Sequence, residues 1–121
     1  IVIGHEVARS LGVRSIFAER RDGEMTLRRG FSVSPEERVL IVEDVVTTGG
    51  SVREVAGLVS GLGATIVAFG FILNRSGGEP DLGAPARALL ARDMESYEEG
   101  DCPLCSAGVP IVKPGSRPDS G

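Results

Sequence analysis

The stretch from Val39 to Ser51 constrains the fold more than any other part of the chain. It opens with an apolar, mostly β-branched run, which predicts a strand buried on both faces, as in a parallel sheet. Two carboxylates, Glu43 and Asp44, follow where that strand is expected to end, and a loop rich in hydroxyls and glycine leads into a run with helical spacing. Because open α/β sheets bind ligands at the carboxyl ends of their strands, this order predicts a ligand site here.

The loop carries groups that suit an anion, typically a phosphate. Gly49 and Gly50 allow the backbone to approach a ligand closely. Thr47, Thr48 and Ser51 add hydroxyl donors, and Ser51 is also a good helix N-cap. The helix N-terminus that follows offers unpaired backbone N–H groups and the positive end of its dipole.

The acidic pair narrows the choice of ligand, because carboxylates repel a bare phosphate. A ribose 5-phosphate fits better, since its hydroxyls donate to carboxylates and its anomeric carbon becomes cationic when a substituent leaves. A Walker phosphate loop is excluded because no Gly-Lys-Ser/Thr occurs, and no Gly-x-Gly-x-x-Gly follows a predicted strand. The alternative is an ordinary strand–turn–helix in which Glu43 and Asp44 form a solvated turn.

Length and charge limit the remaining possibilities. At 121 residues the chain is expected to form one domain, with enough apolar content for a core. Its net charge of −4 does not indicate a nucleic-acid surface. No apolar run approaches the ~20 residues of a membrane span. Because the chain begins at Ile1 in an apolar run rather than at methionine, we expect it to be the carboxyl-terminal part of a longer protein.

The first residues predict a βαβ arrangement. Residues 1–4 are expected to end a strand, residues 5–11 to form a short helix closed by Gly12, and residues 14–18 to form the next strand. His5, the sole histidine, stands at the predicted strand–helix junction. A capping or packing role is favoured there over catalysis.

Residues 19–30 interrupt this pattern with a strongly charged segment. Asp22-Gly23 predicts a hairpin turn. The segment also holds several arginines, namely Arg20, Arg21, Arg28 and Arg29. A charge run is usually a solvated face, but guanidinium groups bind phosphate oxygens in bidentate fashion. We favour an arm that folds over a polyanionic ligand.

Beyond the loop, residues 52–62 have helical spacing, and Gly61 and Gly63 end that helix. The apolar run 64–73 predicts a second buried parallel strand, and residues 86–90 a shorter one. Arg75 follows the second strand, at the same sheet edge as Glu43. It is a candidate for an anionic or carbonyl-bearing substrate, with a plain surface charge as the alternative.

Cys102 and Cys105 have a Cys-x-x-Cys spacing. Zinc needs four ligands, and the chain supplies half of such a site. A redox pair would normally stand at a helix start behind an early strand rather than in a tail rich in proline and glycine. Structural or incidental thiols are therefore favoured over a zinc shared across a dimer. From about residue 106 the tail is expected to be extended and frayed.

The stretch from Val39 to Ser51 resembles the phosphoribosyl-diphosphate (PRPP) motif of the type I phosphoribosyltransferases: an apolar run, an acidic pair, two further residues and Thr-Gly-Gly-Ser. Other segments resemble orotate phosphoribosyltransferases in particular, namely Gly4 to Ala8, Phe17 to Arg20, Leu27 to Phe31, Asn74 to Ser76, Cys-Pro-Leu-Cys and Lys-Pro-Gly-Ser-Arg. The resemblance implies the type I α/β fold, a central parallel β-sheet flanked by helices, here missing its amino-terminal part. It also implies a homodimer and Mg²⁺ bound through the diphosphate, with no metal ligands from the protein.

The resemblance also assigns roles by position. The PRPP-binding residues would be Glu43, Asp44, Val45, Val46, Thr47, Thr48, Gly49, Gly50 and Ser51. Thr47 and Arg75 match positions that contact orotate. The flexible catalytic loop would begin at residues 19–21, so that Arg20 and Arg21 join Glu43 and Asp44 as candidate catalytic residues. Many members have lysines and a histidine in that loop, and this chain has neither, which puts the proton-handling role in doubt.

The function implied is transfer of ribose 5-phosphate from PRPP to orotate in pyrimidine (UMP) biosynthesis, giving orotidine 5′-phosphate and diphosphate in the cytoplasm. Catalysis would rest on positioning and electrostatics. Three alternatives stay open: a transferase for a purine base, a PRPP-sensing regulator without catalysis, and a degenerate structural paralogue that binds neither substrate.

Overall fold

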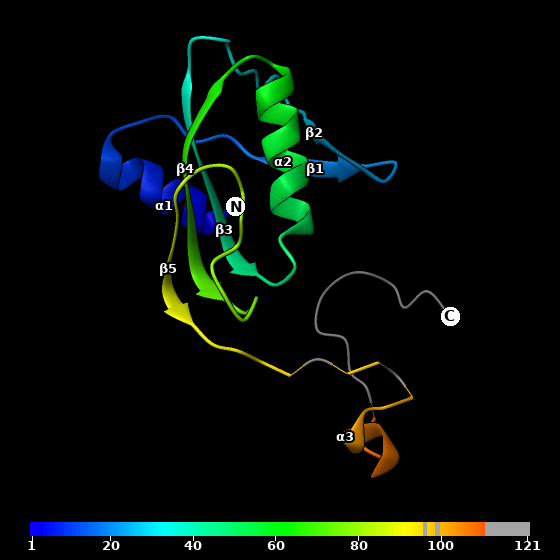
Figure 1. The fold of residues 1–121 in the computed structure, drawn as a ribbon. Coiled ribbons are helices and arrows are strands. Elements are labelled where there is room, and N and C mark those ends of the chain that lie inside the picture. Colours follow the sequence, from blue (N-terminus) through cyan, green and yellow to red (C-terminus); the bar gives the residue numbers. More distant parts are fainter. Residues whose placement is uncertain (96, 99, 111–121) are drawn as a thin grey trace.

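The fold was analysed in a computed structural model that describes residues 1–95, 97–98 and 100–110. Along this part of the chain the elements are α1 (Val2–Leu11), β1 (Ala18–Arg21), β2 (Glu24–Leu27), β3 (Arg38–Val46), α2 (Gly50–Gly61), β4 (Thr65–Asn74), β5 (Ala86–Ala91) and α3 (Pro103–Ser106). Strands β3, β4 and β5 form a parallel sheet, and β1 and β2 form a separate hairpin (Figure 1).

The parallel sheet has the order β3-β4-β5, so β4 is its central strand within the described residues. Val46 at the end of β3 pairs with Asn74, and Asn74 pairs with Ala91 at the end of β5. The carboxyl ends of all three strands therefore share one edge. The predicted parallel strands at 64–73 and 86–90 and the helix after the glycine loop are confirmed.

Helix α2 covers one face of the sheet and forms the core with it. Val52 on α2 packs with sheet residues, and Val46 and Phe69 are each only 1% exposed. The other members of this cluster are Ile41 and Phe71. The helical spacing of the residues after Ser51 and the apolar strands together predict this packing.

The opposite face of the sheet carries exposed apolar side chains. Leu40 is 36% exposed, Ile72 41% and Leu89 85%. Leu40 alternates along β3 with the buried Ile41, so the two side chains point to opposite faces. The prediction that the apolar run of β3 is buried on both faces is therefore wrong at Leu40, although α1 packs against β3 as well as α2.

The prediction for the amino-terminal residues is also wrong. Residues 1–4 do not end a strand, because α1 begins at Val2 and the His5 N–H donates to the Ile1 carbonyl at 3.1 Å. Residues 14–17 form no strand, and the chain becomes extended and paired only at Ala18. Gly12 does close α1 as predicted, in a left-handed conformation with φ 66°.

The hairpin turn predicted at Asp22-Gly23 is confirmed. Strands β1 and β2 pair antiparallel, from Ala18 opposite Leu27 to Arg21 opposite Glu24. Asp22 has φ 50° and Gly23 has φ 91°. Positive φ at both central residues is the requirement of the type I′ turn that joins tightly twisted strands, and Asp-Gly meets it at low cost.

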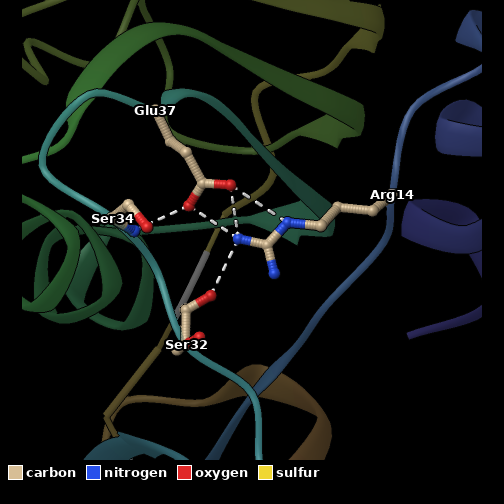
Figure 2. Close-up of polar contacts among 4 residues, drawn as sticks. All are labelled: Arg14, Ser32, Ser34 and Glu37. Carbon is tan, nitrogen blue, oxygen red and sulfur yellow. Dashed lines mark hydrogen bonds and ion pairs between the residues drawn. The ribbon is translucent and has the colours of Figure 1, made fainter.

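A polar cluster ties the segment after α1 to the segment before β3 (Figure 2). The Arg14 guanidinium donates to Glu37 through Nη2 at 2.6 Å and to the Ser32 carbonyl at 2.8 Å. Glu37 Oε2 also accepts the Ser34 backbone N–H at 2.7 Å. The Ser34 N–H, followed by Arg14, lowers the pKa of Glu37. This cluster fixes the entry into β3.

No helix in the described part of the chain is long and apolar enough to cross a membrane. The predicted extended tail, from about residue 106, lies only partly within the described residues. The short helix α3 (Pro103–Ser106) ends where the predicted tail begins, and residues 107–110 form no helix or strand. Residues 111–121 lie outside the described residues.

Candidate functional site

The loop between β3 and α2 is held by a left-handed glycine. Gly49 has φ 77° and ψ 9° and is the N-cap of α2, which begins at Gly50. The prediction that Ser51 caps this helix is therefore wrong, since Ser51 lies in its first turn. Any other residue at position 49 would be strained in this conformation, which is the reason for a glycine there. The first N–H groups of α2 lack intrahelical acceptors and are directed out of its N-terminus.

An open cavity of about 450 Å³ lies between the loop after β3 and the loop after β4. Its lining residues are Thr47, Thr48, Arg53, Arg75, Ser76, Gly78, Glu79, Pro80 and Asp81. The cavity brings Thr47, Thr48 and Arg75 together, as the sequence predicts. It lies at the carboxyl edge of the sheet, where α/β folds bind ligands.

The backbone of Arg75 is held by a hydrogen bond, whereas a donor atom of its side chain lacks an acceptor. Its N–H donates to the Val46 carbonyl at 2.8 Å, which joins the ends of β3 and β4. Its buried Nε makes no hydrogen bond in the part of the chain that the structure describes. Because a buried donor without an acceptor costs free energy, this guanidinium is suited to an acceptor that enters the cavity.

Asn74 shapes the loop that presents Arg75. Its side chain is buried, its Oδ1 accepts the Ser76 N–H at 2.8 Å, and its Nδ2 donates to the Gly78 carbonyl at 2.7 Å. These bonds close the turn on both sides of Arg75. Sequence reasoning assigned Asn74 no role of its own, and a polar residue that ends an apolar strand was the available signal.

The acidic pair lies inside β3 rather than beyond its end. Glu43 is opposite Phe71 in the ladder, and the strand continues to Val46, so the predicted strand end is wrong. Neither carboxylate lines the cavity. Their backbone contacts are local: the Asp44 N–H donates to Glu43 Oε1 at 3.0 Å, and the Val45 N–H donates to Asp44 Oδ1 at 2.8 Å.

The two carboxyl groups divide the charge unequally. Burial raises the pKa of Glu43, and the hydrogen bond with Asp44 adds to the rise. The hydrogen bond from Glu43, followed by that from the Val45 N–H, lowers the pKa of Asp44. Asp44 is therefore the member of the pair that keeps its negative charge most firmly.

The hairpin arginines are already paired with carboxylates. Arg20 Nη2 lies 2.8 Å from Glu54 on α2, and this bond raises the pKa of Arg20. Arg21 lies 3.4 Å from Asp22, and Arg29 3.3 Å from Glu19. Neither Arg20 nor Arg21 lines the cavity. The structure thus joins this arm to α2 and does not bring it to Arg75.

Arg53 is a cavity residue that sequence reasoning missed. It lies one turn into α2, and its Nη1 donates back to the Thr48 carbonyl at 2.6 Å. The same nitrogen is 3.1 Å from the place where a side chain at Gly49 would begin. A cation therefore lies directly over the glycine loop. Its spacing of four residues from Gly49 along the helix was the only signal in the sequence.

Residues 5–100 match the family described as the phosphoribosyl transferase domain. The chain belongs to this family. The match contains the glycine loop, the cavity and the hairpin, and it ends before Cys102.

Curated relatives support a closer grouping within the phosphoribosyltransferases. Orotate phosphoribosyltransferase of Pelotomaculum thermopropionicum is 57% identical over 117 residues, which is 97% of this chain and 62% of that protein. The enzyme of the same name from Thermotoga maritima is 54% identical over 97% of this chain and 63% of its own length. The chain thus spans somewhat less than two thirds of these relatives.

Solved structures show the same fold. Adenine phosphoribosyltransferase from Saccharomyces cerevisiae aligns with a TM-score of 0.59 at 24% identity, over 74% of this chain and 59% of that one. The adenine phosphoribosyltransferase from Trypanosoma brucei aligns with a TM-score of 0.57 at 24% identity, over 98% of this chain and 60% of that one. The predicted phosphoribosyltransferase fold, with helices flanking a parallel sheet, is confirmed.

Proposed function

We propose that this phosphoribosyltransferase chain carries the PRPP site and part of the base site of an orotate phosphoribosyltransferase. The protein would transfer ribose 5-phosphate from PRPP to orotate, giving orotidine 5′-phosphate and diphosphate. The observation that carries the proposal is the Arg75 guanidinium, whose buried Nε lacks an acceptor beside Thr47 and the glycine loop. The names of the similar curated proteins support orotate as the base.

The phosphate of PRPP would bind at the N-terminus of α2. Left-handed Gly49 is the N-cap of this helix, whose first N–H groups would donate to the phosphate, and Thr47, Thr48 and Ser51 would add hydroxyl donors. Backbone donors and the helix dipole suit a phosphate without a lysine. Arg53 adds a positive charge on the same side.

The acidic pair would act on the ribose. Asp44, with its lowered pKa, stays ionised at neutral pH and would stabilise positive charge that develops at the anomeric carbon. Glu43 has a raised pKa and would accept or donate a hydrogen bond at the sugar hydroxyls. Asp44 would thus stabilise charge, and Glu43 would position the sugar.

Orotate would bind on the Arg75 side. It is anionic and carries carbonyl oxygens, and it would supply the acceptor that Nε lacks. Hydrogen bonds to charged groups are worth roughly 1.5–3 kcal/mol, enough to favour orotate over neutral bases. Attack by the orotate nitrogen at the anomeric carbon would then release diphosphate.

Magnesium belongs to the proposal as a partner of the diphosphate. Bound to its oxygens, Mg²⁺ would neutralise charge on the leaving group. Glu79 and Asp81 on the cavity wall carry the oxygen ligands that Mg²⁺ prefers, so the lining fits an ion that arrives with the substrate. A homodimer and a cytoplasmic location complete the proposal, both on the resemblance to the family.

The test is an assay of the full-length protein with PRPP, Mg²⁺ and either orotate or a purine base. Formation of orotidine 5′-phosphate, with no turnover of adenine, hypoxanthine or guanine, supports the proposal. Purine turnover would show a purine transferase instead. PRPP binding by calorimetry without any product would show a regulator, and absence of both would show a degenerate paralogue.

The phosphate part of the proposal has its own variant. Gly50→Val places a branched side chain beside the helix N-terminus, where a Cβ has only an ordinary contact, 3.7 Å to Thr48 Oγ1. PRPP affinity should fall while the melting temperature is kept. Gly57→Val in the same helix is the matched control, because a Cβ there meets nothing within 4 Å.

A further inference from the structure

Cys102 and Cys105 lie outside the residues that match the family, and the proposed transfer reaction does not use them. Cys102 is the N-cap of α3, Pro103 begins the helix, and Cys105 is one turn away. Helix α3 lies apart from the parallel sheet (Figure 1). The prediction that the two cysteines do not stand at a helix start is therefore wrong. Of the two observations against a redox role, only their position in the tail, away from an early strand, remains.

The two thiols are in direct contact. The Cys105 backbone N–H and its thiol both form hydrogen bonds with Cys102 Sγ, and these bonds lower the pKa of Cys102. Neither residue is in a disulfide, and both side chains are partly exposed. A lowered pKa raises the thiolate fraction of a partly exposed thiol, and the thiolate is the form that attacks a disulfide.

The backbone around the pair is well determined by local bonds. The Ser106 N–H and Oγ both contact the Cys102 carbonyl, at 3.0 and 3.2 Å. The Gly108 N–H donates to the Cys105 carbonyl at 2.9 Å, and Gly108 has φ 77°. Each cysteine is therefore bonded to the turn that follows, and their contact does not depend on packing against the sheet.

We propose that Cys102 and Cys105 form a dithiol site that converts reversibly into a disulfide by exchange with a low-molecular-weight disulfide, RSSR. The Cys102 thiolate attacks one sulfur of RSSR, the S–S bond breaks, and RS⁻ leaves and is protonated to RSH. Cys105, losing its proton, then attacks Cys102 Sγ in the mixed disulfide and releases a second RSH. Two cysteine thiols are oxidised, and one RSSR is reduced to two RSH.

A zinc site is the competing use of such a pair. Zinc needs four ligands, and in the described ranges no group of three His, Cys, Asp or Glu side chains lies together. A metal would thus require further ligands from outside the described residues. Exchange requires only the two thiols that are in contact, and it is therefore the use that the geometry favours.

The test uses full-length protein, reduced and then incubated with glutathione disulfide, followed by alkylation and peptide mass spectrometry. We expect a disulfide within the peptide that holds both cysteines, reversed by excess reduced glutathione. Cys105→Ser should trap a mixed disulfide of glutathione on Cys102. Cys102→Ser should react more slowly, because Cys105 is the donor in the contact.

Ser106→Ala keeps both thiols and is the control for changes in the helix, and circular dichroism of all variants checks folding. The proposal is overturned if no internal disulfide forms, if only disulfides between chains form, or if both single variants react equally. It is also overturned if the purified protein holds stoichiometric zinc that protects the thiols until a chelator removes it. The PRPP and orotate assays are independent of these outcomes, so either proposal can fail without the other.

Discussion

Two regions of this member of the phosphoribosyl transferase domain family carry arginines, and they hold them in opposite ways. At the carboxyl edge of the sheet, Arg75 is fixed by its backbone bond to Val46, while its buried Nε has no acceptor in the described structure. In the charged segment of residues 19–30, Arg20 in β1 and Arg29 after β2 are exposed and already paired with Glu54 and Glu19.

Under the proposed function, the two regions would be two kinds of anion site. The Arg75 side would be preorganised, because the backbone bond to Val46 holds Arg75 in place before a ligand binds. The hairpin side is exchangeable, because exposed ion pairs contribute little and are easily replaced by a stronger acceptor such as diphosphate. A hairpin that acts on the leaving group must therefore first release Glu54.

The largest effect is expected at the acidic pair. Asp44→Asn keeps the shape and removes the charge that is proposed to face the sugar cation, so turnover should fall by about 10²–10³. Steady-state kinetics of the full-length protein measures it. Asp22→Asn at the hairpin turn is the matched control, since Asn also tolerates the φ of 50° there, and it should turn over almost normally. Wild-type turnover in Asp44→Asn would remove the ribose assignment.

The next effect tests the preorganised arginine. Arg75→Ala should raise the KM for orotate by roughly ten- to 150-fold and change the KM for PRPP far less, because one charged hydrogen-bond donor to the base is lost. Arg9→Ala, which removes an exposed arginine that pairs with Glu6 on α1, is the control. Equal effects of Arg75→Ala on both substrates would place Arg75 outside the base site.

A smaller effect tests the exchangeable side. Arg20→Ala should raise the KM for PRPP by roughly two- to fivefold, as expected for an exposed charged contact. Glu54→Ala frees Arg20 from its partner on α2 and should lower that KM or leave it unchanged. If Glu54→Ala raised the KM for PRPP as much as Arg20→Ala does, the ion pair would be structural. Arg20 would then not be an arginine that exchanges Glu54 for diphosphate.

The smallest effect concerns the cluster before β3. The lowered pKa of Glu37 means that its stabilising contribution is present above the ordinary carboxyl pKa and is lost as the pH falls through the lowered value. Glu37→Gln should therefore lower the melting temperature slightly at pH 7 and have no effect at strongly acidic pH. Glu36→Gln, at the neighbouring exposed position, is the control in the same thermal scans. A difference that persists in acid would contradict this role.

The sequence predicted the β3–α2–β4 unit well, because its apolar runs are long and its helical spacing is regular. It predicted the first residues wrongly, because a short apolar run such as residues 1–4 does not distinguish a strand from a helix turn. The extension of β3 through Glu43 and Asp44 depends on pairing with β4, which no local pattern contains.

The candidate site was predicted in part for the same reason. Thr47 and Arg75 follow two strands directly, so topology alone brings them together. Arg53 is placed by a side chain that folds back from α2, and Glu79 and Asp81 by the course of a loop, so neither contribution is visible in residue spacing. The assignments of Glu43, Asp44, Arg20 and Arg21 to catalysis remain predictions.

The exposed apolar face of the sheet affects how strongly the chain associates with itself in solution. Leu40, Ile72 and Leu89 lie on neighbouring strands and form a hydrophobic surface that is exposed to water. Such surfaces bind hydrophobic dyes and favour self-association that grows with concentration. Strand β5, at the edge of the sheet in the described structure, adds open backbone groups beside them. Light scattering of this 121-residue chain should therefore rise steeply with concentration, while added charge at Leu89 should suppress it.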